Sequence, residues 1–142
     1  MQTFLPDACF RTSCSVLDRQ RLGKQRVEAF QVLRTLTNET TGWRNHPCTR
    51  MWRGFEHRLI EYGLMACLEW QRRGYQDTIE PRFLRYKELY KHRSGDPPWL
   101  GCGEFHRSHR SNLLRKNRIW YSQFWPEERD DLPYVWPQPK EP

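Results

Sequence analysis

Long apolar runs are missing from this chain of 142 residues, of which 37% are hydrophobic. No window approaches the roughly 20 consecutive apolar residues that a membrane-spanning helix needs. The stretch from Met1 to Phe10 contains proline, an acid and a cysteine in place of the apolar centre of a signal peptide. These absences argue against a membrane partner and predict a soluble, cytoplasmic protein folded as one domain over residues 1–142.

The sequence also lacks the paired cysteines of disulfide frameworks and zinc sites. Its five cysteines are odd in number and form no CxxC pair, which indicates free thiols in a reducing compartment. A Gly-rich phosphate loop and a serine-nucleophile elbow are missing too, so we expect no cofactor. Zinc stays open as a rival, but without a strong ligand spacing we predict no metal. Its possible ligands are Cys102, His106 and His109, with His46 or Cys48 as a fourth.

The chain contains fewer acidic than basic residues. The chain has 24 Lys and Arg against 17 Asp and Glu, a net charge of +7 and a pI near 9.4. From Cys9 to Lys24 the one acid is Asp18, and from His106 to Arg118 there is no acid among the cations. Concentrated positive charge attracts polyanions, and abundant aromatic residues can stack on bases. Nucleic acid is therefore the leading partner, with a solvated basic surface as the alternative.

Strand-type alternation is missing as well, whereas three- and four-residue apolar spacing recurs along the chain. We predict an all-α fold, a compact single domain of three to five helices with long loops. Residues 1–13 are expected to be irregular, and the Pro-rich tail, 126–142, to be extended and to lie across the helices through Tyr134 and Trp136. The predicted helices cover 15–36, 51–73, 81–92 and 108–123, the last as one helix or two. The clearest core stripe comprises Met51, Trp52, Phe55, Leu59, Tyr62 and Ala66.

Glu28 is the first candidate for chemistry, because it is the only acid between Asp18 and Glu39 and follows several cations. A carboxylate among cations repels phosphates, so it has either a structural or a chemical reason to be there. The structural reading is a Lys24–Glu28 surface pair, and the chemical one is a general acid/base facing a bound sugar. The same polar helix face carries Arg21, Gln25 and Gln31, with Arg26 beside it.

Two further constellations could bind DNA. His106 and His109 share a helix face in HRSHRSNLLRK, and imidazoles beside arginines suit proton transfer or phosphate contact. The turn GWRNHP, from Gly42 to Pro47, combines an aromatic, a cation and an amide that could receive a flipped base. Ordinary hydrogen-bonding histidines and ordinary turn chemistry remain alternatives. The predicted DNA contacts are Arg21, Lys24, Arg26, Arg44, Asn45, His46, His106, Arg107, Arg110, Arg115 and Lys116.

Several segments of the chain resemble those of a known family. The run VLDRQRLGKQRVEAFQVL, Val16 to Leu33, is similar to the first helix of pyrimidine-dimer DNA glycosylase/AP lyases of the bacteriophage endonuclease V type. The segment from Gly54 to Thr78 resembles that family's long central helix. The motifs WRNHP, MWRGFE, PPWLG, HRSH, LLRK and LPYVWP are similar to a compact bacterial and viral branch, so the resemblance covers nearly the whole chain.

The resemblance implies a helical enzyme that kinks DNA and acts on a pyrimidine dimer or another modified base. An amine at the start of the chain attacks C1′ to form an imine, and an α-amine suits this because it titrates near 8. Glu28 falls on the family's catalytic glutamate, which stabilises the sugar cation and assists β-elimination. The family removes Met before a small residue, whereas Gln2 follows Met1 here, so retention of Met1 is expected. Val27, Gln31 and Arg21 stand where the family has two arginines and a histidine.

We therefore predict a monomeric base-excision enzyme for double-stranded DNA, with Glu28, Met1, Gln2 and His109 as its catalytic candidates. One alternative is a related nucleic-acid or nucleotide enzyme that uses a His106/His109 site. The other is a nucleic-acid-binding module without catalysis.

Overall fold

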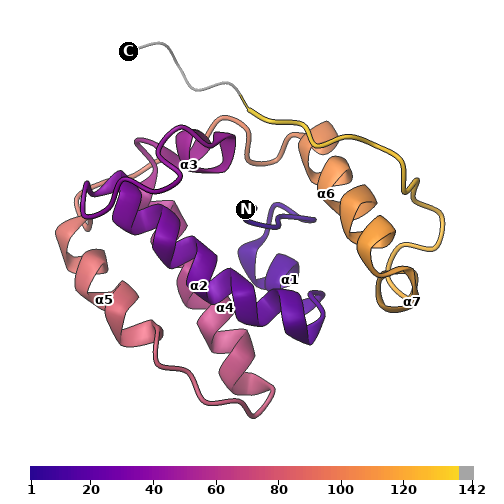
Figure 1. Ribbon diagram of the computed structural model, residues 1–142, viewed down its shortest axis with the longest axis horizontal. Coiled ribbons are helices and arrows are strands. Elements are labelled where there is room, and N and C mark those ends of the chain that lie inside the picture. The colour runs from indigo at the N-terminus through magenta and orange to yellow at the C-terminus, as the bar shows by residue number, and fades with distance from the viewer. Residues whose placement is uncertain (138–142) are drawn as a thin grey trace.

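Seven α-helices and no strand make up the part of the chain that the computed structural model describes, residues 1–137. The predicted all-α class is therefore confirmed, while the helices are more numerous and shorter than expected. Figure 1 shows their arrangement. They are α1 (Phe10–Ser15), α2 (Arg19–Leu36), α3 (Pro47–Trp52), α4 (Glu56–Arg72), α5 (Glu80–Leu89), α6 (Gly103–Lys116) and α7 (Arg118–Tyr121).

The core is built on the pairing of α2 with α4, and α1 and α5 pack on α4 as well. On α2 the apolar residues Leu22, Ala29 and Leu33 recur at helical spacing and are fully buried. On α4 Leu59 and Ala66 are buried in the same way. Burial of these two stripes against each other stabilises the fold, because removing apolar area from water is favourable.

The helix predicted from Met51 to a stop at Gly74 is interrupted, so that prediction was wrong at one point. Helix α3 ends at Trp52 and α4 begins at Glu56. Gly54 lies between them with φ +88°, a left-handed conformation that ends a helix and that glycine adopts without strain. The apolar spacing continues across the break because both helices face the same core.

The predicted boundaries at the two ends of the chain also shift. Helix α1 begins inside the segment predicted as irregular, where Phe10 and Cys14 are buried and favour a helical turn against α4. Helix α6 begins at Gly103, before the predicted start at Ser108.

Gly63 permits close packing of α5 on α4. A Cβ at this position would lie 2.2 Å from Cζ of Phe83, whose side chain is fully buried. A side chain here would have to displace that ring, so only glycine allows the observed helix separation.

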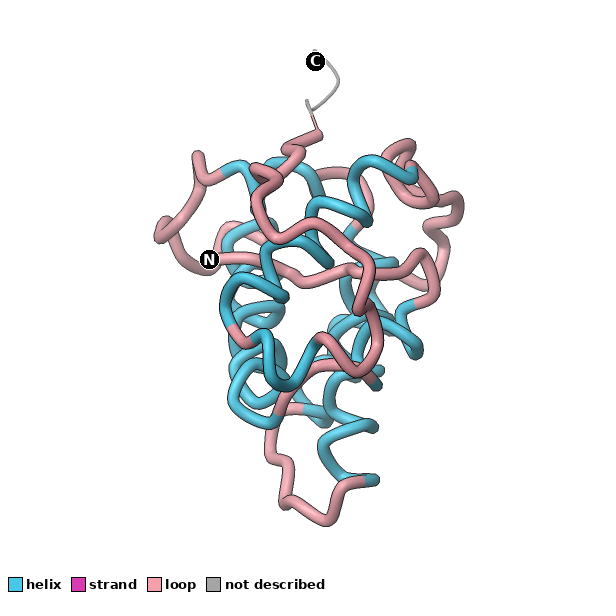
Figure 2. Tube along the Cα trace, turned by 90° about the vertical axis from the view of Figure 1, so that its right-hand side faces the viewer, coloured by secondary structure: helices cyan, strands magenta, loops and turns pink. Residues whose placement is uncertain are grey.

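The start of the chain lies between α2 and α3 on one side and α6 on the other (Figure 1). After α7 the chain turns back and runs along α6, on the side that faces the viewer in Figure 2. We call residues 126–137 the C-terminal strap. Two α6 hydroxyls accept its backbone N–H groups, Ser111 from Leu132 at 3.0 Å and Ser108 from Val135 at 3.1 Å. The last five residues of the predicted tail, 138–142, lie outside the described residues.

None of the helices described is both long enough and apolar enough to cross a membrane.

Candidate active site

A pocket of about 290 Å³ lies beside the start of the chain. It is formed where the N-terminal residues meet the polar face of α2, one residue at the end of α6 and one residue of the C-terminal strap. Segments far apart in the sequence therefore share this wall. The lining residues are Met1, Gln2, Phe4, Gln20, Arg21, Lys24, Gln25, Glu28, Lys116 and Tyr134.

The Glu28 carboxylate lies next to the backbone of residue 2. Its Oε2 accepts a hydrogen bond from the backbone N–H of Gln2 at 3.3 Å and another from Nε2 of Gln25 at 3.5 Å. Within residues 1–137, no ion pair joins Glu28 to Lys24, so the surface-pair alternative is not what the structure forms. The half-buried carboxylate instead faces the start of the chain.

The electrostatic surroundings of Glu28 are positive. Lys24 and Lys116 line the same pocket, and the described residues include no carboxylate in an ion pair with either of them. Arg21 also lines it, but pairs with Asp18 at 3.2 Å. A carboxylate flanked by cations can stabilise a developing sugar cation while the cations bind neighbouring phosphates.

Gln25 and Tyr62 organise the chain leading into the pocket. The Gln25 amide accepts from Phe4 N at 2.8 Å and donates to the carbonyl of Gln2 at 2.9 Å. The Tyr62 hydroxyl, fully buried, lies 2.7 Å from both the Phe4 carbonyl and Oε1 of Gln25. The backbone of residues 2–4 is thereby held against α2 and α4 by side chains, with no pairing to another strand.

A second, wider groove of about 760 Å³ is also lined by Glu28. Its wall is more apolar and includes Trp70 and the exposed Val27. Although it is larger, it does not contain the start of the chain, and the smaller pocket is therefore the better place for chemistry at an amine. The two hollows share Gln20, Lys24 and Glu28.

His106, predicted to contact DNA, and His109, predicted to be catalytic, both lie inside the protein. His109 is fully buried, and its Nδ1 accepts from Leu5 N at 2.8 Å. His106 is buried too, with Nδ1 2.7 Å from the Leu5 carbonyl and Nε2 accepting from Gly101 N at 2.9 Å. Burial lowers the pKa of both histidines, that of His109 to about 3. They are neutral near pH 7 and have no nitrogen directed at a phosphate.

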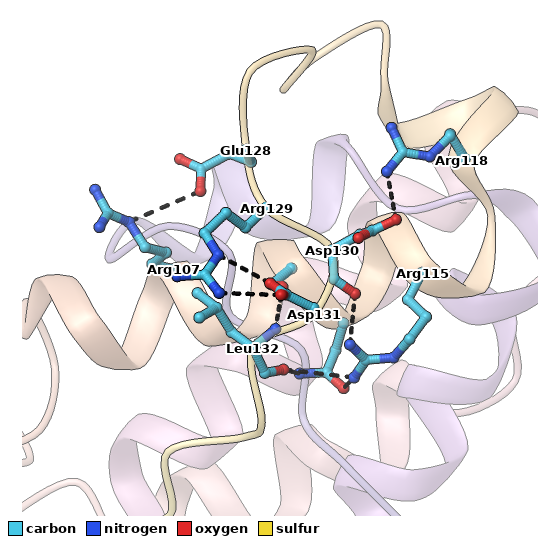
Figure 3. A network of polar contacts seen from close by, with 10 residues as sticks. Arg107, Arg115, Arg118, Glu128, Arg129, Asp130, Asp131 and Leu132 are labelled. Atoms are coloured by element: carbon cyan, nitrogen blue, oxygen red, sulfur yellow. Dashed lines mark hydrogen bonds and ion pairs between the residues drawn. The ribbon is translucent and has the colours of Figure 1, made fainter.

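The arginines of α6 predicted to bind phosphates are bonded to the C-terminal strap (Figure 3). Arg115 donates to the Asp130 carbonyl at 2.6 Å, and Asp130 forms an ion pair with Arg118. Arg107 lies 3.8 Å from Glu128. Acids of the strap therefore pair with Arg107 of α6 and with Arg118 of α7, whereas Arg115 is bonded to backbone carbonyls of the strap.

Arg110 and Arg26 are likewise engaged within the protein. Arg110 donates to the Pro6 carbonyl at 2.8 Å and lies 3.4 Å from Glu128. Arg26 pairs with the buried Asp77, and its guanidinium lies 4.4 Å from the Trp70 ring centroid. Arg26 therefore holds α2 to the end of α4 and does not line the pocket of Glu28.

The GWRNHP turn lies at the entrance to α3. His46 caps that helix, since its Nδ1 accepts from Cys48 N at 3.0 Å. Desolvation lowers the pKa of His46, helped by the positive charge at the start of the chain. Trp43 is exposed with φ +64°, and its ring contacts His46 edge-on. Arg44 and Asn45 are exposed beside it.

The possible zinc ligands of the rival reading do not form a metal site among the described residues. Within residues 1–137 no cluster of three or more His, Cys, Asp or Glu side chains is suited to a metal ion. The ring nitrogens that would serve as ligands in His106 are bonded to backbone groups instead.

Four residues that line the pocket were not among the predicted site residues, namely Phe4, Gln20, Gln25 and Tyr134. Gln25 was assigned to the polar helix face but is buried, and its spacing of three from Glu28 was the available signal. Tyr134 was noticed only as a residue of the tail, and no sequence pattern placed it at the pocket. Burial raises the pKa of Tyr134 to about 12, so its phenol stays protonated at neutral pH.

A family model described as pyrimidine dimer DNA glycosylase matches residues 1–82, which is more than half of the chain. The matched part includes the N-terminal segment, Gln25, Glu28 and Tyr62, whereas α6 and the C-terminal strap lie beyond it. Among curated proteins and among solved structures, no significant match to the chain is found.

Proposed function

Because this chain belongs to the pyrimidine dimer DNA glycosylase family, we propose that it excises a pyrimidine dimer from double-stranded DNA and then cleaves the strand by β-elimination. The observation that carries the proposal is the distance of 3.3 Å between Oε2 of Glu28 and the backbone nitrogen of Gln2. It brings a carboxylate and the start of the chain to one pocket, as a reaction between an amine and a sugar requires.

The amine is the nucleophile in this proposal. Its nitrogen bonds to C1′ of the damaged nucleotide while the bond to the base breaks, and the base leaves with the bonding electrons and takes up a proton. Glu28 stabilises the positive charge that develops on the sugar. The sugar ring then opens to an imine, and loss of a C2′ proton expels the 3′ phosphate.

With Met1 retained, the amine belongs to Met1, which lines the pocket with Glu28. Removal of Met1 would turn the nitrogen of Gln2, already bonded to Glu28, into the amine. Both possibilities place the nucleophile in the same pocket, and the mass of the intact protein distinguishes them.

DNA binds over the face that carries this pocket. Lys24 and Lys116 are exposed at its rim, and Arg44 and Asn45 are exposed on the turn before α3. Such cations contact phosphates and thereby set the register of the duplex. The protein acts as a monomer in this proposal, since one copy contains every group named.

The test is borohydride trapping on a duplex that carries one thymine dimer, with the undamaged duplex as a control. The wild type should form a covalent adduct and nick the damaged strand. Peptide mapping should place the adduct on the peptide that begins the chain, and not on the peptides of Lys24 or Lys116. Absence of both adduct and nick would refute the proposal.

Substitution of Glu28 by Gln keeps the size of the side chain and removes its charge. Excision should fall by about 100-fold or more, because a lost acid/base or charge-stabilising group costs that much, while affinity for the damaged duplex is kept. Glu39→Gln is the matched control, since Glu39 is exposed beyond the end of α2 and should leave the rate unchanged.

A further inference from the structure

The HRSHR stretch of α6, His106 to Arg110, has no part in the chemistry proposed above, yet three of its side chains bind the N-terminal segment. His109 accepts from Leu5 N at 2.8 Å. His106 lies 2.7 Å from the Leu5 carbonyl, and Arg110 donates to the Pro6 carbonyl at 2.8 Å. Side chains of α6 therefore form hydrogen bonds with the backbone of two successive residues, Leu5 and Pro6.

The hydrogen bonds require opposite tautomers of the two histidines. Nε2 of His106 accepts from Gly101 N at 2.9 Å, so its proton is on Nδ1 and is donated to the Leu5 carbonyl. Nδ1 of His109 accepts from Leu5 N, so its proton is on Nε2. That Nε2 is buried and has no hydrogen-bond partner among the described residues. A buried donor without a partner costs stability, and a purely apolar residue would avoid this cost.

The His109 ring is immobilised on several sides. Phe105 packs against it with ring centroids 4.5 Å apart, and Phe4 and Tyr134 contact it edge-on at 6.2 and 5.6 Å. Tyr134 itself lines the pocket of Glu28. The ring therefore joins the N-terminal segment to the C-terminal strap within one packed unit.

These contacts fix how far the start of the chain reaches. Gln25 and Tyr62 hold residues 2–4 from the α2 and α4 side, and α6 holds residues 5–6 from the opposite side. Met1 extends from this doubly held segment and lines the pocket together with Gln2. A shift of Leu5 would move the amine relative to Glu28 and the sugar, and misplacement by ~1 Å can slow a reaction by about 100-fold.

We propose that His106, His109 and Arg110 form a clamp on residues 5–6, in which His109 is a positioning residue that sets the place of the N-terminal amine relative to Glu28. This inference rests on the proposed function. It assigns a role in the reaction to a part of the chain outside residues 1–82, the region that matches the family.

The experiment compares His109→Asn with His109→Leu. The side-chain oxygen of Asn is as many bonds from Cα as Nδ1 of His, so Asn can still accept from Leu5 N. Leu has the same branching and a similar size but cannot accept a hydrogen bond. Both variants leave a comparable space where the ring was, and their difference therefore isolates the acceptor.

The measured quantity is the single-turnover rate of borohydride-trapped adduct on the dimer-containing duplex at saturating DNA, together with the Kd for that duplex. We expect His109→Leu to be slower by about 100-fold with unchanged Kd, and His109→Asn to recover most of the wild-type rate. A folded His109→Leu variant that reacts at the wild-type rate would overturn the inference.

A second variant keeps the test decisive if His109→Leu does not fold. Arg110 is only half-buried, so Arg110→Met removes the bond to the Pro6 carbonyl without opening the core. It should also slow adduct formation at saturating DNA, and a wild-type rate for Arg110→Met would count against the clamp.

If the wild-type protein forms no adduct, the proposed function fails and the clamp is judged by hydrogen exchange alone. Amides of residues 3–10 should then exchange faster in His109→Leu than in His109→Asn, while exchange in α4 is equal. Equal exchange of residues 3–10 in the two variants would refute the clamp independently of activity.

Discussion

His109 makes the stability of this protein depend on pH. Burial, reinforced by the nearby His106, lowers its pKa from the ordinary value of 6.5 to about 3. Between these values the unfolded chain binds a proton that the folded protein does not bind. The contribution of neutral His109 is therefore complete above pH 6.5 and is lost as the pH falls from there toward 3.

The size of this effect follows from the same shift. At about pH 5 the solution is about 1.5 pH units below the unfolded-state value, and each unit is worth about 1.4 kcal/mol. We expect the free energy of unfolding to fall by about 2 kcal/mol between about pH 7.5 and pH 5 through His109 alone. This corresponds to a decrease in Tm of roughly 4–8 °C for a domain of this size.

Urea denaturation of the wild type and of His109→Asn at both pH values measures this contribution. His46 and His106 titrate in both proteins, so their effects cancel in the difference between the two pH dependences. The wild type should lose about 2 kcal/mol more than the variant, which has no titratable group at this position. Parallel losses in the two proteins would refute the assignment of a deeply buried, neutral His109.

Two further predictions concern the DNA-binding face and the core. Lys24→Gln should reduce the slope of log Kobs against log salt by about 0.9, because one phosphate contact is lost. Arg118→Gln should change this slope little, because Arg118 is paired with Asp130. An equal decrease in both variants would show that DNA contacts Arg118 as well and would contradict this prediction. Gly63→Ala should lower the free energy of unfolding by about 1–3 kcal/mol, because the added Cβ would overlap the Phe83 ring. Thermal unfolding measures this change. An unchanged Tm would contradict the close packing of α5 on α4.

The helical class and the main core could be predicted from the sequence because apolar residues repeat with the period of a helix. Leu59, Tyr62 and Ala66 were expected on one core-facing stripe and are buried together. The break at Gly54 was not predicted, since the apolar stripe runs on across it. Spacing reports which residues face the core, but it does not report whether the backbone between them stays helical.

The candidate site could be predicted only in part. Glu28 was singled out as a lone acid among cations, which is a local property that the sequence contains. The histidines of HRSHR were predicted to contact DNA or to take part in catalysis, with ordinary hydrogen bonding as the alternative, because histidine in a basic segment has the same sequence signature whether it is exposed or buried. Their burial depends on residues 4–6, which contact them across about a hundred positions of the chain.

The sequence by itself determined the helix periods, the excess of positive charge and the presence of one carboxylate in a cationic stretch, because each is a property of neighbouring residues. Only the tertiary structure decided which cations remain available. Glu128 of the strap pairs with Arg107 and Arg110 of α6, while Lys24 and Lys116 stay at the rim of the pocket. The same holds for the place of residues 1–6 between α2 and α6, since hydrogen bonds between distant segments form only after the chain has brought those segments together.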